Sequence, residues 1–418
     1  MNNNIKILHI VARGLGGGAA RGAYWLHLGL RELGVNSKIL TNSKVTLGDE
    51  NVTTILKTKK SKIENMVRSQ LDGLPVLFYK NRKKIIFSTG FIGLNFTKTK
   101  EYKEADIIHL HWINGAFVNV KDLSKIDKPI VWTMRDMWPF TGGCHYSLNC
   151  DKYKIGCGNC PQLNSNKNFD LSRWVLNRKK KYLQKSMKIV GISHWLSDEA
   201  KKSELFRDFD VKTIINNINS NDFFAIDKNI AKEILGIKTN KKIILAGSTS
   251  LKDFYKGFDK YLDAIGQLDK DKYFLCFFGN LDKSVVEKLG FEYKSFGFLY
   301  DTVSLRLLYS ASNVFVAPSI MDAFGKTLAE SMACGTPVVC FNATGPKDIV
   351  THKVDGYFAK PYDATDLANG IEWVLEDSIR WKQLSRNARE KVIKEFDMIK
   401  VAEKYKDLYE NILKRENN

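Results

Sequence analysis

Two acidic residues with seven residues between them, Asp322 and Glu330, flank a glycine in one short segment of the chain. The apolar run just before them, 314–318, is typical of a buried strand, so Asp322 follows the carboxyl end of that strand. Open parallel sheets bind ligands at this edge. Gly325 can begin a helix there, and the free N–H groups of a first helical turn attract anions. The pattern predicts a site for a negatively charged ligand.

The residue types in this segment suit a sugar that is attached to a diphosphate. The N–H groups of Lys326 and Thr327 would hold phosphate oxygens. Glu330, further along the helix, would accept hydrogen bonds from sugar hydroxyls. We therefore interpret the segment as a nucleotide-sugar site. The alternative is a capped helix with two solvated acids.

A second glycine-rich segment follows the first predicted strand, 5–11, and precedes a helical pattern over 19–33. It contains Gly16, Gly17 and Gly18, which would let the backbone approach a substrate closely. The spacing is a degenerate form of Gly-x-Gly-x-x-Gly, and no acidic residue ends the next strand. A dinucleotide site is therefore disfavoured, and a tight turn is the alternative to substrate binding.

Four of the seven cysteines fall in one short stretch: Cys144, Cys150, Cys157 and Cys160. The last two form a Cys-x-x-Cys pair, which is common in zinc sites. We expect the loop 144–160 to bind a structural zinc ion through these thiolates, or with His145 in place of one of them. Such a closed site would organise the loop without performing chemistry. The alternatives are reduced thiols in a packed loop and a redox function.

A basic stretch with apolar residues at helical spacing lies between 59 and 84. Its apolar members are Ile63, Met66, Val67, Leu71 and Leu74, and its basic members are Lys59, Lys60, Lys62, Arg68, Arg82, Lys83 and Lys84. A helix of this kind can rest on an anionic membrane leaflet. The alternative is a helix that packs on its own domain and exposes a lysine face.

Composition limits the classes of function. A length of 418 residues predicts two domains, and a hydrophobic content of 44% is typical of a globular chain. The net charge of +19 favours anionic partners, but no motif for nucleic-acid recognition is present. No run reaches the roughly 18 apolar residues of a membrane span, and the first residues lack a signal peptide's apolar core. We expect a cytoplasmic protein, peripheral on the inner face of the cytoplasmic membrane, with reduced or metal-bound cysteines.

The order of the predicted elements indicates two parallel sheets. Strands alternate with helical segments, and the candidate strands are 5–11, 37–41, 107–111, 130–133, 188–192, 242–247, 273–279, 314–318 and 336–341. This rhythm predicts two doubly wound, Rossmann-like domains. We expect an N-terminal, acceptor-side domain over 1–210, a nucleotide-sugar domain over 211–395, and a C-terminal helix over 396–418 that crosses back to the first domain.

Several motifs, taken in order, resemble family 4 retaining glycosyltransferases. The segment from Asp322 to Glu330 is similar to the family's pair of acidic residues with seven between them, with Asp in place of the first Glu. The segments 105–112, 132–138, 141–146 and 342–350 resemble a subgroup that includes colanic-acid and other exopolysaccharide enzymes. The resemblance covers nearly the whole chain. It implies the GT-B fold, in which two Rossmann-like domains face each other across a cleft.

The resemblance also implies roles for residues of the second domain. Glu330 would bind the donor ribose, Asp322 would face the donor sugar, and Lys256 would neutralise the diphosphate leaving group. Many relatives carry Arg where Ser248 stands, and Lys252 would supply the missing charge. The stretch from Phe324 through Gly325, Lys326 and Thr327 would contact phosphate or sugar oxygens.

In the first domain, the resemblance implies that Gly16–Gly18 and His111 contact substrate and that Arg135 and His145 lie at the reacting sugar. Many relatives carry His where Arg135 stands. Arginine is not a base near neutral pH, but it can orient a hydroxyl or bind phosphate. No catalytic metal is implied.

The function implied is sugar transfer, with retention of configuration, from a UDP- or GDP-sugar to a lipid-linked or other glycan acceptor in bacterial surface polysaccharide synthesis. Two alternatives remain open: a sugar-nucleotide epimerase of the same fold, and a noncatalytic partner subunit.

Overall fold

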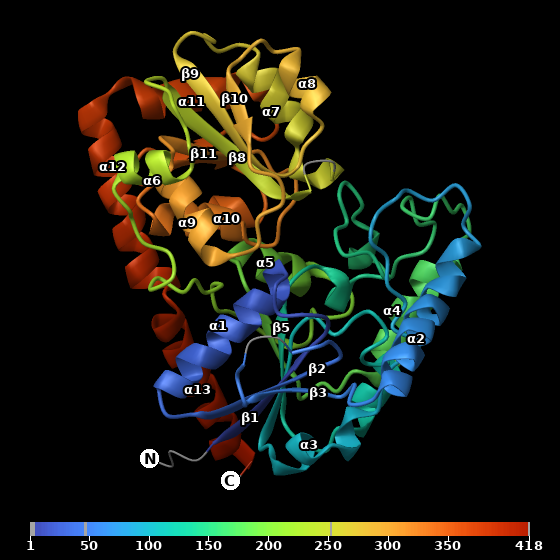
Figure 1. The fold of residues 1–418 in the computed structure, drawn as a ribbon. Helices are drawn as coiled ribbons and strands as arrows, with labels where there is room; N and C mark the ends of the chain where they lie inside the picture. Colours follow the sequence, from blue (N-terminus) through green and yellow to red (C-terminus); the bar gives the residue numbers. More distant parts are fainter. Residues whose placement is uncertain (1–4, 46–47, 251–252, 417–418) are drawn as a thin grey trace. The chain divides into compact units, whose positions relative to one another are not determined.

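The computed structural model describes residues 5–45, 48–250 and 253–416 (Figure 1). The chain forms two compact units. The N-terminal unit comprises Met1–Ile215 and Val401–Asn418, and the C-terminal unit comprises Asn216–Lys400. The sequence placed these boundaries at 210 and 395.

The N-terminal unit contains a seven-stranded sheet in which every strand pair is parallel, in the order β3-β2-β1-β4-β5-β6-β7. Its strands are β1 (Lys6–Val11), β2 (Asn36–Thr41), β3 (Val52–Thr54), β4 (Ile107–Leu110), β5 (Ile130–Met134), β6 (Lys188–Gly191) and β7 (Asp210–Thr213). Its α-helices are α1 (Gly18–Glu32), α2 (Lys59–Leu77), α3 (Lys100–Glu104), α4 (Leu171–Tyr182), α5 (His194–Lys202) and α13 (Met398–Glu416). Short 3₁₀ turns are η1 (Phe96–Lys98), η2 (Val120–Lys125), η3 (Trp138–Phe140) and η4 (Lys152–Lys154).

The C-terminal unit contains a six-stranded parallel sheet in the order β10-β9-β8-β11-β12-β13. Its strands are β8 (Lys242–Ser250), β9 (Tyr273–Asn280), β10 (Tyr293–Ser295), β11 (Val314–Ala317), β12 (Val338–Phe341) and β13 (Gly356–Ala359). Its α-helices are α6 (Lys228–Ile234), α7 (Phe258–Ile265), α8 (Lys283–Glu287), α9 (Thr302–Ala311), α10 (Lys326–Ala333), α11 (Ala364–Glu376) and α12 (Ser378–Lys391). The short segments are η5 (Phe254–Lys256), η6 (Gly345–Asp348) and the π-helical η7 (Val392–Phe396). The two parallel sheets confirm the predicted fold class.

The central strands are apolar because helices cover both faces of a parallel sheet. In β1, Ile7, Leu8, Ile10 and Val11 are all buried, and β11 is buried along its whole length. His9 interrupts the apolar run of β1 and is fully buried. Its Nδ1 atom lies 2.9 Å from Nε2 of His111, which directly follows β4, whereas its Nε2 atom has no hydrogen-bond partner among the described residues.

Helix α13 belongs to the N-terminal unit although it ends the chain. Its apolar face, including Val401 and Leu408, packs in one core with Ile7 and Leu26. Its tyrosines also reach the sheet: the Tyr409 hydroxyl lies 2.6 Å from His109 Nδ1. The Tyr405 hydroxyl lies 2.8 Å from Thr133 Oγ1.

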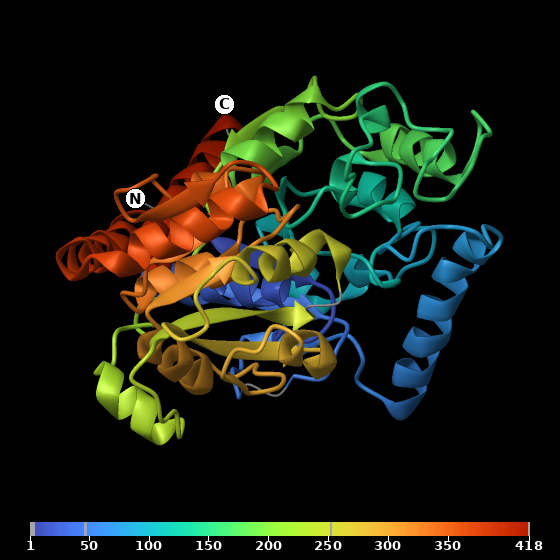
Figure 2. The same cartoon turned by 90° about the horizontal axis from the view of Figure 1, so that it is seen from above.

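Helix α2 lies at the periphery of the N-terminal unit in both views (Figure 1, Figure 2). Its described side chains bury little, and the two buried members are Asp72 and Val76. The apolar residues that the sequence singled out are exposed by 44% to 69%: Ile63, Met66, Val67, Leu71 and Leu74. The apolar stripe therefore does not pack on its own domain. Within the described part of the chain, no helix has the length and apolar content to cross a membrane.

Candidate active site

The nucleotide-sugar segment begins where two neighbouring strands of the C-terminal unit end. Strands β8 and β11 are adjacent and parallel, so the loops after them meet at one edge of the sheet. The first loop carries Lys256 and the second carries Asp322. Lys256 Nζ lies 2.6 Å from Asp322 Oδ2. The structure thus brings together two predicted site residues that are 66 positions apart.

The carboxylate of Asp322 also organises its own loop. Its Oδ1 atom accepts hydrogen bonds from the backbone N–H groups of Phe324 and Gly325, at 3.2 and 3.1 Å. Burial acts to raise the pKa of this carboxyl, but the Lys256 ammonium and the two amides outweigh it and hold the pKa below its usual value. Asp322 is therefore ionised at neutral pH.

Two backbone features fix the Lys256–Asp322 pair. Gly257 adopts φ +64°, and a Cβ there would lie 2.0 Å from the carbonyl oxygen of Pro318, so only glycine fits between the two loops. The amide of Asp322 donates to Thr344 Oγ1 at 3.2 Å, and its carbonyl accepts from the amide of Gly345 at 2.9 Å. The segment 342–350, one of the motifs that the sequence analysis noted, therefore supports Asp322 from a third loop.

Helix α10 starts directly after this loop. Gly325 precedes it with φ +97°, a left-handed conformation that suits glycine. The amides of Lys326 and Thr327 lie in the first turn, where helical N–H groups have no intrahelical acceptor. The Phe324 side chain is buried and packs against Phe396, with ring centroids 5.8 Å apart. Only the backbone of Phe324 therefore faces the candidate site.

Glu330 lies one turn further along α10 and is buried. Its Oε2 atom accepts a hydrogen bond from the Tyr309 hydroxyl on α9 at 3.1 Å. Its Oε1 atom lies 3.2 Å from Lys326 Nζ. A ligand hydroxyl would reach this carboxylate by exchanging places with the lysine. Lys252, which the sequence assigned to the same site, lies outside the described residues.

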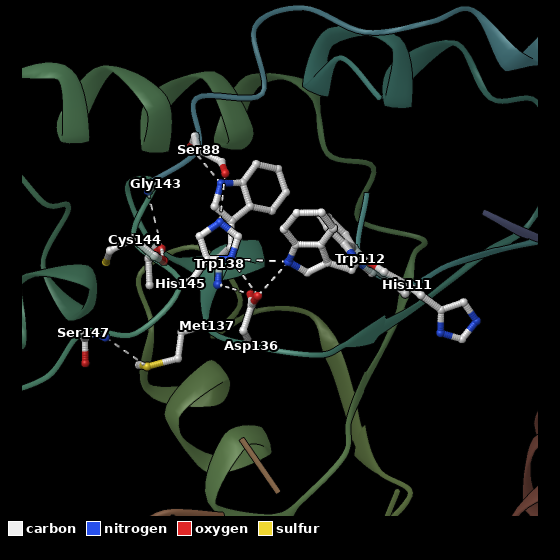
Figure 3. Close-up of polar contacts among 12 residues, drawn as sticks. Ser88, His111, Trp112, Asp136, Met137, Trp138, Gly143, Cys144, His145 and Ser147 are labelled. Carbon is white, nitrogen blue, oxygen red and sulfur yellow. Dashed lines mark hydrogen bonds and ion pairs between the residues drawn. The ribbon is translucent and has the colours of Figure 1, made fainter. Parts of the chain in front are cut away.

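In the N-terminal unit, the imidazole of His145 lies between an acid and a hydroxyl (Figure 3). Its Nδ1 atom is 2.7 Å from Asp136 Oδ2, and its Nε2 atom is 2.9 Å from Ser88 Oγ. Asp136 Oδ2 also accepts from Trp112 Nε1 at 2.9 Å. A proton on Nδ1, directed at the carboxylate, leaves Nε2 as the hydrogen-bond acceptor of the ring. An acid that orients an imidazole beside a hydroxyl is a general-base geometry.

Arg135 is buried beside His111, and its Nη2 atom lies 3.1 Å from His111 Nδ1. Burial lowers the pKa of Arg135 to about 10, so the guanidinium stays charged at neutral pH. His111 therefore accepts from Arg135 through Nδ1 and donates through Nε2 to His9 Nδ1, 2.9 Å away. Burial, followed by nearby positive groups, holds the pKa of His111 well below its usual value. The neutral histidine fixes the position of the cation.

The predicted glycine loop is exposed. A Cβ at Gly16, Gly17 or Gly18 would meet no atom within 4 Å among the described residues. Internal packing therefore does not require glycine at these three positions. Gly18 begins α1, so its open surface adjoins a helix N-terminus.

The comparisons with known proteins first concern the C-terminal unit. Residues 227–391 match the family model described as glycosyl transferases group 1. This stretch is a group 1 glycosyl transferase domain. It contains the Lys256–Asp322 pair, helix α10 and Glu330.

Two curated relatives extend the likeness. An uncharacterized glycosyltransferase of Methanocaldococcus jannaschii is 25% identical over 75% of this chain and 85% of its own length. The UDP-Gal:alpha-D-GlcNAc-diphosphoundecaprenol alpha-1,3-galactosyltransferase of Escherichia coli is 29% identical over 24% of this chain and 26% of its own length.

Two solved structures match nearly the whole chain. The sucrose-phosphate synthase of Thermosynechococcus elongatus has a TM-score of 0.72 at 20% identity, covering 98% of this chain and all of its own. HepE of Anabaena, in complex with UDP-glucose, has a TM-score of 0.64 at 18% identity, and the match covers 97% of this chain and 100% of the HepE chain. At these identities the likeness shows the fold alone, which is the predicted GT-B fold.

The structure adds candidate site residues that the sequence analysis did not assign. Ser88 and Asp136 complete the His145 arrangement, and Tyr309 holds Glu330. Arg13 follows β1 in a left-handed conformation, φ +66°, and its guanidinium lies 4.8 Å from the centre of the Trp112 ring. A positive φ at a non-glycine residue is uncommon and often marks a functional site. No sequence pattern reveals it.

The four clustered cysteines line one small cavity in the N-terminal unit. His145 is not among the residues that line it. Its two ring nitrogens contact Asp136 and Ser88, and Figure 3 shows the Cys144 sulfur directed away from its ring. The structure thus disfavours His145 as a substitute metal ligand for one of the thiols.

Proposed function

We propose that this protein transfers a sugar from a nucleotide-sugar donor, a UDP- or GDP-sugar, to a lipid-linked or other glycan acceptor, with retention of configuration. The proposed setting is the synthesis of a bacterial surface polysaccharide. One observation carries the proposal: the Lys256–Asp322 pair lies beside the first turn of α10, at the carboxyl ends of two adjacent parallel strands.

The donor diphosphate would bind the first turn of α10 and the ammonium of Lys256. Free amides at a helix start and a nearby cation are the groups that phosphate requires. Negative charge builds on the diphosphate as the glycosidic bond breaks, so Lys256 would stabilise the transition state more than the ground state. Asp322 would then face the donor sugar, and Glu330 would bind the ribose hydroxyls. The complex of HepE with UDP-glucose supports a donor of this class for the fold.

The N-terminal unit would supply the acceptor groups. His145, oriented by Asp136, would accept a hydrogen bond from an acceptor hydroxyl in the way it now contacts Ser88. Arg135, held by His111, would orient a hydroxyl or bind phosphate without acting as a base. The E. coli relative, whose name specifies a diphosphoundecaprenol-linked sugar, supports an acceptor of the lipid-linked class.

The exposed stripe of α2 would hold the enzyme on the inner face of the cytoplasmic membrane. Met66 and Ile63 are more than 60% exposed, and basic residues surround them. Apolar side chains that enter the headgroup region, together with lysines near anionic lipids, bind a helix to a membrane surface. A lipid-linked acceptor lies on the same surface.

A donor screen tests the proposal. Full-length protein would be incubated with UDP- and GDP-sugars and a lipid-linked acceptor, and both released nucleotide and the glycoside would be measured. We expect nucleotide release that requires acceptor, and a product with the anomeric configuration of the donor. Interconversion of the donor sugar without acceptor would indicate an epimerase. Absence of both donor binding and turnover would indicate a noncatalytic subunit.

A further inference from the structure

Four thiols from one loop line a single cavity in the N-terminal unit. The loop lies between β5 and α4, and its cysteines are Cys144, Cys150, Cys157 and Cys160. All four are free thiols, and no disulfide joins any of the seven cysteines. We propose that these four cysteines bind one structural zinc ion.

The backbone around the Cys-x-x-Cys pair is shaped for such a site. Gly156, Cys157, Gly158 and Asn159 all have positive φ, between +44° and +103°. Four successive residues in this region form a tight turn that keeps the two cysteine side chains on one cavity. A Cβ at Gly158 would lie 2.1 Å from the carbonyl oxygen of Asn168, so glycine is required there.

Backbone amides point at two of the sulfur atoms. The N–H groups of Gln162 and Leu163 hydrogen-bond the Cys160 sulfur, and the N–H of Gly142 hydrogen-bonds the Cys157 sulfur. Amide donors favour a negatively charged sulfur over a neutral thiol. Burial is the larger effect and raises the pKa of both thiols, and the amides act in the opposite direction, toward the thiolate that binds zinc.

A buried lysine lies next to the cavity. Lys179 on α4 is 0% exposed, and its ammonium donates to the carbonyls of Trp138 and Thr141 and lies 3.7 Å from the Trp138 ring centre. Burial lowers the pKa of Lys179 to about 7, and negative charge on Cys144 and Cys157 acts to raise it. Zinc with four thiolates carries two negative charges, which an ammonium at this position would partly offset.

Zinc binding requires small movements of the side chains. No three of these sulfur atoms, which all belong to described residues, lie within 4.8 Å of one another. Tetrahedral zinc with Zn–S bonds of about 2.3 Å places sulfurs about 3.8 Å apart. Because the four side chains already face one cavity, rotations about their Cα–Cβ bonds shorten these distances while the turn stays in place.

The histidine cluster is a weaker candidate for metal. His9, His109 and His111 have ring nitrogens within 4.8 Å of one another. Both nitrogens of His109 are engaged by Tyr409 and Thr133. His111 is bonded to His9 and to the guanidinium of Arg135, a cation that would repel a metal ion. The cysteine cavity therefore carries the proposal.

The test is metal analysis of full-length protein that is purified without chelator. We expect about one zinc per chain, the stoichiometry of a single structural site. Cys157→Ser and Cys160→Ser should each lower the zinc content at least about tenfold, because three thiolates remain of four. The matched control is Cys340→Ser, because Cys340 is a buried cysteine of the other unit. This variant should keep the zinc content of the wild-type protein. Circular dichroism and thermal unfolding show whether each variant stays folded.

Cobalt substitution provides a measurement that needs no variant. Wild-type protein refolded or exchanged with Co²⁺ should show the absorption of tetrahedral cobalt bound to thiolates. Less than about 0.1 zinc per chain, with four rapidly reacting thiols in the loop, would overturn the proposal. Two disulfides among these cysteines in freshly purified protein would overturn it as well. Neither result would bear on the sugar-transfer proposal, whose readout is the donor screen.

Discussion

Each acid of the proposed nucleotide-sugar site contacts a lysine that the donor would also use. Asp322 contacts Lys256, and Glu330 contacts Lys326. Both lysine side chains are partly exposed, whereas Glu330 is buried. A diphosphate would therefore compete for lysines that are already paired, and the acids would be released toward the sugar and ribose hydroxyls. At the residue scale, the proposed donor binding would be an exchange of ion pairs.

The first prediction concerns Glu330→Gln. A neutral amide replaces a charge-assisted hydrogen bond of about 1.5–3 kcal/mol, so UDP or GDP affinity should fall about 10- to 100-fold. Calorimetry with the free nucleotide measures it. Glu233→Gln, an exposed acid on α6, is the control and should bind normally. Wild-type affinity in Glu330→Gln would remove this residue from the ribose site.

The second prediction concerns the Lys256–Asp322 pair. Lys256→Ala should lower kcat more than it weakens donor binding, because the leaving diphosphate gains charge in the transition state. Asp322→Asn should also damage turnover more than nucleotide affinity. The increase in activation free energy of the double variant should be smaller than the sum of the increases in the two single variants. The reason is that the two side chains contact each other, at 2.6 Å. Lys260→Ala on α7 is the control. If the two increases in activation free energy were fully additive, the two residues would act independently.

The residues that sequence reasoning located share a local pattern, and those it missed do not. Asp322, Gly325 and Glu330 lie within one strand–loop–helix segment, where spacing alone indicates which groups face a ligand. Ser88 lies 57 residues before His145, and only the folded loop brings their side chains to 2.9 Å. The left-handed backbone of Arg13 leaves no mark in the sequence either. Contacts across distant loops require the tertiary structure.

At the scale of elements, the amphipathic pattern between 59 and 74 correctly predicted a helix, α2, but it did not settle what the apolar face contacts. The spacing of apolar residues shows that one face of the helix is apolar. The same spacing is found in helices that pack on a domain and in helices that lie on a membrane. Here the apolar side chains, Met66 and Ile63 among them, are exposed, while the helix is anchored by Asp72. That carboxylate accepts from Thr89 Oγ1 and from the amide of Phe91, both at 2.8 Å.

The third prediction follows from this exposed face. Replacing Met66 and Leu71 together with Gln should weaken binding to vesicles that contain anionic lipid by at least about tenfold, because each buried apolar side chain contributes about 1.5–3 kcal/mol. Co-sedimentation measures it, and salt should weaken the wild-type binding. Ile379→Gln, an apolar residue that is 79% exposed on α12, is the matched control. Equal binding of all three proteins would argue against α2 as the membrane contact.

The fourth prediction concerns the buried histidines around β1. Burial lowers the pKa of His27 to about 4, although Asp49 acts to raise it. The unfolded chain therefore binds a proton that the folded chain does not, and stability falls as the pH drops from about 6.5 toward 4. For His27, the full loss of unfolding free energy across this pH range is about 3 kcal/mol. Burial likewise holds the pKa values of His9, His109 and His111 well below normal, and they add in the same direction.

Thermal unfolding at about pH 7.5 and about pH 5 measures this dependence. His27→Gln should flatten the pH dependence, because its side chain does not titrate. His194→Gln, at an exposed histidine, should leave it unchanged. If stability changed equally with pH in both variants, His27 would not take up a proton on unfolding between these two pH values.

At the scale of the whole molecule, each unit has its own core, but the N-terminal unit is completed only by the last residues of the chain. The contact between Tyr409 and His109 joins residues 300 positions apart. The sequence predicted a terminal helix that returns to the first domain, and it could not indicate that two tyrosines would satisfy buried polar groups of the sheet. Contacts of such long separation form late, because loop closure must come first.

The last prediction uses this dependence to separate the two units. Tyr409→Phe removes the hydroxyl that contacts His109 Nδ1 and leaves a buried imidazole nitrogen without that partner, at a cost of about 1–3 kcal/mol. The matched control is Tyr261→Phe in the C-terminal unit, because the buried Tyr261 hydroxyl has no hydrogen-bond partner among the described residues. Its removal should be neutral or stabilising. Hydrogen exchange should therefore accelerate in β4 and β5 of Tyr409→Phe while β11 keeps wild-type protection, and nucleotide binding should persist. Faster exchange in β11 as well would show that the two units unfold as one, since a loss confined to one core leaves the protection of the other unchanged.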